Sequence, residues 1–187
     1  MIMEKILAVD LDAVLADVQT VYVDIVRKEH GHDVSYEDID NWDFWFNLLG
    51  PKVAWEIFKR IWVERANDVN LFDPNAPNAL YKAIGMGYQV SIITATQKEC
   101  IPNVSKWLDA HKVPYKSIIG LFNGQSKYDY PWDAIIDDSP KFAEMAKTHN
   151  NGKPIKIFLL SQPWNRSVKN QIPIRVENFD QMLQELE

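Results

Sequence analysis

The chain alternates between short apolar runs and longer amphipathic stretches, and this alternation is the feature that most limits its fold. The apolar runs have the length of buried strands and lie at 6–9, 88–93, 117–122, 134–136 and 155–160. Helical spacing is found at 14–30, 51–62, 77–84, 101–110 and 140–149, after Ser35, and after Asn178 as a cap. Strands that alternate with helices predict an α/β protein, a three-layer α/β/α sandwich with a mostly parallel sheet.

Acidic residues stand at the ends of two of these strands. Asp10 and Asp12 directly follow the first apolar run, and Asp137 and Asp138 follow the run at 134–136. The carboxyl ends of parallel strands share one edge of the sheet, so these acids are expected to meet. Carboxylates so close repel one another unless a cation or a shared proton intervenes. The pattern therefore predicts one site for a hard metal ion such as Mg²⁺.

Two further segments bring polar groups to the same edge. The run at 88–93 ends in Thr94-Ala95-Thr96, and Lys127 lies in a loop before the strand at 134–136. A lysine and a hydroxyl can hold phosphoryl oxygens, and an aspartate beside a metal can attack phosphorus. A second aspartate two residues away can protonate a leaving oxygen and later activate water. Taken singly, Lys127 is more typical of a solvated surface charge, and Thr94 could merely cap the following helix.

Together these residues resemble the four motifs of the haloacid dehalogenase-like (HAD) phosphohydrolases. The first motif is matched by Asp10-Leu11-Asp12-Ala13-Val14-Leu15, the second by a strand ending at Thr94, the third by Lys127 and the fourth by Ile135-Ile136-Asp137-Asp138. Within that superfamily the chain resembles the 5′(3′)-deoxyribonucleotidases. That second resemblance rests on 14–17, on 135–140 and on Gln162-Pro163-Trp164-Asn165.

The resemblance implies a Rossmann-like HAD fold and a Mg²⁺-dependent phosphoric monoester hydrolase. Its favoured substrates would be (deoxy)nucleoside monophosphates, cleaved through an aspartyl-phosphate. It implies Asp10 as nucleophile and Asp12 as general acid and base. Mg²⁺ would bind Asp10, the main-chain carbonyl of Asp12, Asp137 and Asp138, and phosphate would bind Thr94, Ala95 and Lys127.

Four positions depart from the family pattern. Ala13 replaces the usual glycine, Val18 stands where an aromatic is common, Ala95 where a second hydroxyl is common, and Gln125 where some members carry a basic residue. The last three leave the substrate preference open. A sugar phosphate, a nucleic-acid 3′-phosphate, and a catalytically inactive nucleotide-binding protein remain as alternatives.

Residues 19–73 are expected to form a helical cap inserted into a core made of residues 1–18 and 74–187. Four of the seven tryptophans lie between Trp42 and Trp62. Phe44-Trp45 resembles an aromatic pair of the family's cap, and flat aromatics can stack on a nucleobase. We therefore expect substrate contacts from Phe44, Trp45 and Trp42, with Phe46 and Trp62 as further candidates. The stripe of Trp55, Phe58 and Trp62 reads alternatively as the cap's own core.

The composition of the chain limits the kinds of partner and the cellular compartment to be expected. A formal net charge of −6 argues against a stable complex with nucleic acid, whose binders usually present a basic face. Cys100 is the single cysteine, which fits a reducing compartment and a cytoplasmic location. No apolar stretch approaches the length of a membrane span, so no membrane partner is expected. The sequence leaves the oligomeric state open, a homodimer included.

Overall fold

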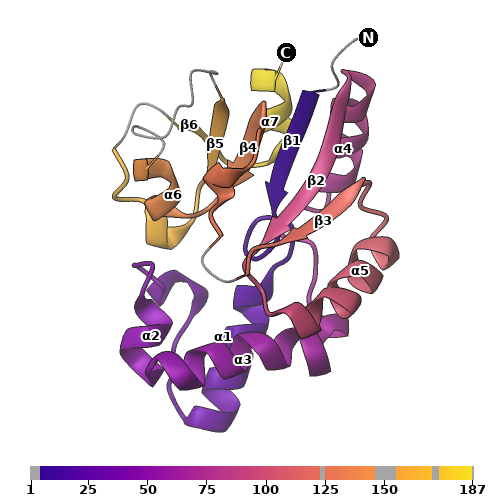
Figure 1. Cartoon of the computed structure of the whole chain (residues 1–187). Coiled ribbons are helices and arrows are strands. Elements are labelled where there is room, and N and C mark those ends of the chain that lie inside the picture. The colour runs from indigo at the N-terminus through magenta and orange to yellow at the C-terminus, as the bar shows by residue number, and fades with distance from the viewer. Residues whose placement is uncertain (1–4, 123–124, 146–154, 170–172, 187) are drawn as a thin grey trace.

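The computed structural model describes residues 5–122, 125–145, 155–169 and 173–186, and a parallel sheet forms its centre (Figure 1). Within these ranges the sheet has six strands in the order β3-β2-β1-β4-β5-β6, and every neighbouring pair is parallel. The strands are β1 (Lys5–Asp10), β2 (Tyr88–Thr94), β3 (Ser117–Gly120), β4 (Ala134–Asp137), β5 (Lys156–Leu160) and β6 (Ile174–Val176). The predicted fold class is confirmed.

Successive strand residues point to opposite sides of the sheet, and in β1 the residues on both sides are apolar. Both faces of the sheet are therefore covered by helices. Leu7 and Val9 of β1 belong to the larger core, which also takes buried residues from α4 (Ala76–Gly85), α5 (Ile101–Ala110) and α7 (Phe179–Leu186). Ala8 between them belongs to a second cluster with Ile135 of β4 and Phe142 of α6 (Pro140–Met145). β1 is therefore buried on both sides, and its carboxyl end is held in a fixed position.

Three helices inserted between β1 and β2 lie beyond the carboxyl end of β1 (Figure 1). These inserted helices are α1 (Val18–His30), α2 (Phe44–Leu49) and α3 (Pro51–Glu64). The chain leaves and re-enters the core at one place, where the Asp17 N–H donates to Asn70 O (2.9 Å) and the Phe72 N–H donates to Leu15 O (2.8 Å). Short 3₁₀ helices complete the chain at Tyr36–Asp38, Ala66–Asp68, Lys98–Cys100, Lys127–Asp129 and Pro163–Asn165.

Short-range contacts and backbone conformation set the two ends of α1. The Asp17 carboxylate accepts from the Thr20 N–H at 3.2 Å and from the Thr20 hydroxyl at 2.7 Å, as an N-cap does. Gly31 ends the helix with φ 71°, a conformation that a residue without a Cβ adopts at little cost. At the far end of the chain, Asn178 Oδ1 accepts from the Gln181 N–H at 3.0 Å and caps α7.

The structure differs from the predicted elements in three places. Residues 14–17 form a tight turn instead of the first turn of α1, because Ala13 takes φ 63° and Leu11 O accepts from the N–H groups of Leu15 (3.0 Å) and Ala16 (2.9 Å). No helix was predicted at 41–50, and this segment contains α2. β6 was missed, and the end of the helix predicted at 140–149 lies outside the described residues beyond 145.

None of the helices in the described part of the chain combines the length and the apolar character that a bilayer crossing requires.

Candidate active site

Buried carboxylates from two strands meet at the carboxyl edge of the sheet. Asp10 ends β1, Asp137 ends β4 and Asp138 follows it, with 7%, 1% and 3% of each residue exposed. One carboxylate oxygen from each of the three lies within 4.8 Å of the others. These residues are adjacent because β1 and β4 are paired in the sheet, with Val9 opposite Ile136. We call Asp10, Asp137 and Asp138 the acid cluster.

Lys127 reaches the acid cluster from the loop before β4. Its ammonium Nζ lies 2.9 Å from Asp10 Oδ1 and also donates to Asp137 Oδ2, and only 14% of its side chain is exposed. Burial alone would lower the pKa of Lys127, but attraction to the two carboxylates outweighs it and holds that pKa above its usual value. Lys127 is therefore a buried cation that neutralises part of the cluster.

Burial and mutual repulsion disfavour the ionised forms of Asp10 and Asp138 despite the charge of Lys127. Burial raises the pKa of Asp10 to about 7, against the opposing pull of Lys127. Burial, followed by repulsion from Asp10 and Asp137, raises the pKa of Asp138 well above its ordinary value, although Trp164 Nε1 donates to Asp138 Oδ2 at 2.9 Å. Three carboxylates thus face one ammonium. An excess of buried oxygen anions within ligand distance of one another suits a divalent metal ion.

Asp12 points away from the acid cluster. Its Oδ1 accepts from the indole Nε1 of Trp62 at 2.8 Å, and its Oδ2 accepts from the Thr94 hydroxyl at 3.2 Å. Burial raises the pKa of Asp12, and these two hydrogen bonds oppose the rise. The Asp12 side chain is therefore not one of the clustered carboxylates. The sequence expectation concerned its main-chain carbonyl, and that stays a prediction.

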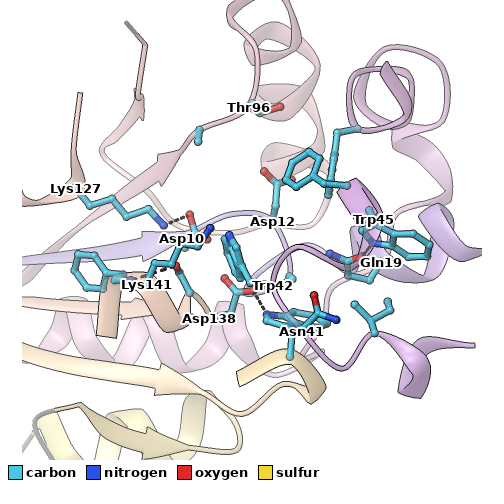
Figure 2. Close-up of a pocket in the computed structure, with 18 of the residues that line it drawn as sticks. Asp10, Asp12, Gln19, Asn41, Trp42, Trp45, Thr96, Lys127, Asp138 and Lys141 are labelled. Atoms are coloured by element: carbon cyan, nitrogen blue, oxygen red, sulfur yellow. Dashed lines mark hydrogen bonds and ion pairs between the residues drawn. The ribbon is translucent and has the colours of Figure 1, made fainter. Parts of the chain in front are cut away.

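A cavity of about 380 Å³ joins the acid cluster to the inserted helices (Figure 2). One end is polar and is lined by Asp10, Asp12, Lys127, Asp138 and Ser139. The other end is aromatic and is lined by Trp42, Trp45, Phe46, Trp55 and Phe58. The cavity therefore offers anionic, cationic and flat apolar surfaces to one small molecule.

The aromatic residues predicted to touch a substrate have different positions. Trp45 lines the cavity, is buried, and stacks on Tyr22 with ring centroids 4.3 Å apart. Trp42 also lines the cavity and is 37% exposed. Phe44 is not among the lining residues and packs edge-on against Trp45 at 4.9 Å. Phe44 therefore supports the wall that Trp45 presents.

The stripe on α3 is only partly a core of its own. Trp55 is 46% exposed and lines the cavity together with Phe58. Trp62 is 1% exposed and belongs to the core, yet its N–H reaches Asp12. Packing and site residues thus share one face of α3.

Only some of the predicted phosphate-binding residues line the cavity. Lys127 and Ala95 line the cavity, whereas the buried Thr94 donates its hydroxyl to Asp12 and accepts from the Thr96 N–H at 3.0 Å. Thr96, Gln19 and Asn41 line the cavity and were not among the predicted site residues. Thr96 stands in the Thr94-Ala95-Thr96 strand end and could have been found there. Gln19 and Asn41 carry no signal in the sequence.

An all-parallel sheet that brings acids from its first and fourth strands to a lysine is the arrangement expected of a HAD-like protein, and solved structures agree on the fold. A haloacid dehalogenase-like hydrolase from Streptococcus pneumoniae is 16% identical over 100% of both chains, with a TM-score of 0.68. A haloacid dehalogenase-like protein from Agrobacterium tumefaciens is 12% identical, with a TM-score of 0.66, over 98% of this chain and 97% of the other. A D,D-heptose 1,7-bisphosphate phosphatase from Burkholderia thailandensis is 10% identical over 98% of both chains, with a TM-score of 0.52.

Residues 4–186 match the family model described as 5′ nucleotidase, deoxy (Pyrimidine), cytosolic type C protein, so the chain belongs to this family. A search of the curated proteins finds no match. Family and fold together identify the chain as a phosphoric monoester hydrolase of the nucleotidase type.

Proposed function

We propose that the chain is a Mg²⁺-dependent phosphatase of deoxynucleoside monophosphates that works through an aspartyl-phosphate. The observation that carries the proposal is the cavity that holds Asp10, Asp12 and Lys127 at one end and an aromatic wall at the other. A phosphate ester fits the polar end, and a nucleobase fits between flat rings. The volume of about 380 Å³ lies within the range of small-molecule sites.

The aspartates divide the chemistry between them. A carboxylate oxygen of Asp10 forms a bond to phosphorus as the bond from phosphorus to the sugar oxygen breaks, and Asp12 gives its proton to that leaving oxygen. Water then attacks the phosphorus, Asp12 takes a proton from it, and inorganic phosphate leaves Asp10 free. The raised pKa of Asp12 favours the protonated form that the first step needs.

Positive charge is required because a phosphate adds at least one negative charge to three carboxylates. Lys127 already lies 2.9 Å from Asp10 and offsets part of it. Asp10, Asp137 and Asp138 would hold Mg²⁺, joined by the Asp12 main-chain carbonyl as the family resemblance implies. Bound Mg²⁺ would supply the remaining charge neutralisation for the phosphoryl oxygens.

Residues 19–73 serve in this proposal as a cap over a core of residues 1–18 and 74–187. The side chains of Trp42 and Trp45 would stack on the base, with Phe44 packed against Trp45 as support. A cap over the acid end excludes water, which strengthens the electrostatic interactions there.

The test is phosphate release by the purified protein. Wild type with Mg²⁺ should hydrolyse deoxynucleoside 5′- or 3′-monophosphates faster than sugar phosphates, and Asp10→Asn should not hydrolyse either. Asp33→Asn, an acid whose side chain is 93% exposed, is the matched control and should keep full activity. Activity that survives Asp10→Asn would exclude the mechanism. Tight nucleotide binding without turnover would instead favour the inactive nucleotide-binding protein.

A further inference from the structure

Gln19 occupies a polar position inside the aromatic end of the cavity. It is the second residue of α1, is 9% exposed, and lines the same cavity as Asp10 and Asp12. A largely buried amide between aromatic rings is costly unless both of its ends are hydrogen-bonded. Its two ends therefore indicate what the cavity is built to hold.

One end of the Gln19 amide has a partner that fixes its orientation. Trp45 Nε1 lies 2.8 Å from Gln19 Oε1. An indole N–H can only donate, so the carbonyl oxygen of Gln19 must face Trp45 and the NH₂ group must face away from it. Figure 2 shows the amide nitrogen turned toward the side on which Asp12 and Trp42 lie.

The partner that sets this orientation is itself held firmly. The Trp45 ring stacks on Tyr22 with centroids 4.3 Å apart, and the Tyr22 hydroxyl donates to Ala54 O at 3.1 Å. Tyr22 of α1 thus contacts both Trp45 of α2 and the backbone of α3. Because Trp45 cannot turn freely, the Gln19 amide is presented to the cavity in one orientation.

The other end of the amide is available. Among the residues that the structure describes, Gln19 Nε2 donates to no protein atom, and because Gln19 lines the cavity, its NH₂ group can donate to a molecule bound there. A donor that is preoriented beside a flat aromatic wall matches an acceptor in the plane of a ring stacked on that wall. A carbonyl oxygen is an acceptor only and meets this requirement best.

We propose that Gln19 is a specificity-determining residue whose NH₂ group donates to a carbonyl oxygen of the substrate's base. This inference rests on the proposed function, since it assigns the base contact of the same site. Thymine and uracil carry two carbonyls each. Adenine carries no carbonyl and accepts hydrogen bonds only at its ring nitrogens, two of which flank an exocyclic amine that is itself a donor. Loss of one such hydrogen bond corresponds to about a tenfold loss in kcat/KM.

Two substitutions of Gln19 distinguish a hydrogen bond to the base from the hydrogen bond that orients Trp45. Gln19→Glu keeps an oxygen acceptor for the Trp45 N–H and removes the donor, whereas Gln19→Met removes both at a similar volume. The measured quantity is kcat/KM for thymidine 5′-monophosphate divided by kcat/KM for deoxyribose 5-phosphate, which has no base. This ratio cancels effects of the added charge on the chemical step. Both variants should lower it about tenfold, and the corresponding ratio for deoxyadenosine 5′-monophosphate should fall less than threefold.

Several outcomes would overturn the inference. If Gln19→Glu keeps the wild-type ratio and only Gln19→Met lowers it, Gln19 acts by holding Trp45 in place. If neither variant changes the ratio, Gln19 does not contact the base. An equal loss with the adenine nucleotide would show a contact that does not read a carbonyl. These results leave the proposed function standing, whereas a wild-type protein that releases no phosphate from any deoxynucleotide overturns both.

Discussion

Trp62 of α3 donates a hydrogen bond from its indole Nε1 to Asp12 Oδ1 over 2.8 Å. This bond joins an inserted helix to an acid that lies just beyond the tip of β1, across 50 residues of sequence. The second oxygen of Asp12 accepts from Thr94 of β2 at 3.2 Å. The position of the proposed general acid is thus set jointly by the sheet and by the inserted helices.

Replacing Trp62 with phenylalanine should lower kcat about tenfold with a smaller change in KM, because Asp12 loses one of the two donors that orient it. Steady-state kinetics with a deoxynucleotide measures the split. Trp107→Phe is the matched control, since Trp107 is also buried and its Nε1 donates to Val69 O at 2.8 Å, outside the cavity. Equal losses of kcat in both variants would mean that Trp62 acts through packing alone.

Magnesium should raise the melting temperature of the wild-type protein, since the ion binds the folded acid cluster and not the unfolded chain. At 100 times its dissociation constant the gain is about 2.7 kcal/mol. Asp138→Asn should reduce the shift, and Asp12→Asn should keep it, because the Asp12 carboxylate lies outside the cluster. Calorimetry with and without a chelator tests this. A larger loss from Asp12→Asn than from Asp138→Asn would contradict the assignment of ligands.

Without metal, the stability contributed by Asp10 should decrease as the pH rises. Burial raises its pKa to about 7 from an ordinary value of 3.8. Between these values the folded state binds the proton more tightly than the unfolded chain, so stability is lost as the pH rises through about 7. Denaturant unfolding in a chelator at pH 5 and pH 8 should show a smaller decrease for Asp10→Asn than for wild type. Identical pH dependence in the two proteins would refute the shift.

Lys127→Met should destabilise the metal-free protein by about 3 kcal/mol and abolish turnover, because Asp10 and Asp137 lose their buried counter-ion. Lys59→Met is the matched control. Lys59 pairs with Glu99 at 3.0 Å on the surface, with 35% and 53% of the two side chains exposed, and its loss should leave both measurements nearly unchanged. An active Lys127→Met enzyme would remove Lys127 from the proposed mechanism.

The sheet and its acidic edge could be predicted because they depend on local patterns. Apolar runs mark β1 and β4, and pairing of parallel strands brings Asp10 to Asp137 without further information. Lys127 was placed by its position before β4, and the last helix was found by its cap at Asn178.

The remaining parts of the site depend on contacts between distant segments. Trp62 has the spacing of a core residue, and its second contact with Asp12 exists only once α3 lies over β1. Gln19 gains its importance from Trp45, 26 residues away. The turn before α1 was missed because Ala13 adopts a positive φ that glycine usually supplies. β6 has three residues, too few for a periodic signal.

The backbone bonds that join Asp17 to Asn70 and Leu15 to Phe72 place the exit and the return of the inserted segment side by side. The inserted segment therefore acts as one closed loop on the sheet. Its length has little effect on the stability of the sheet, since doubling a loop costs only about 0.6 kcal/mol of closure entropy. Other helices, more or fewer, can be spliced in at this junction without altering the path of β1 or β2. The inserted helices can consequently change in number and length, provided that a residue in the place of Trp62 still donates a hydrogen bond to Asp12.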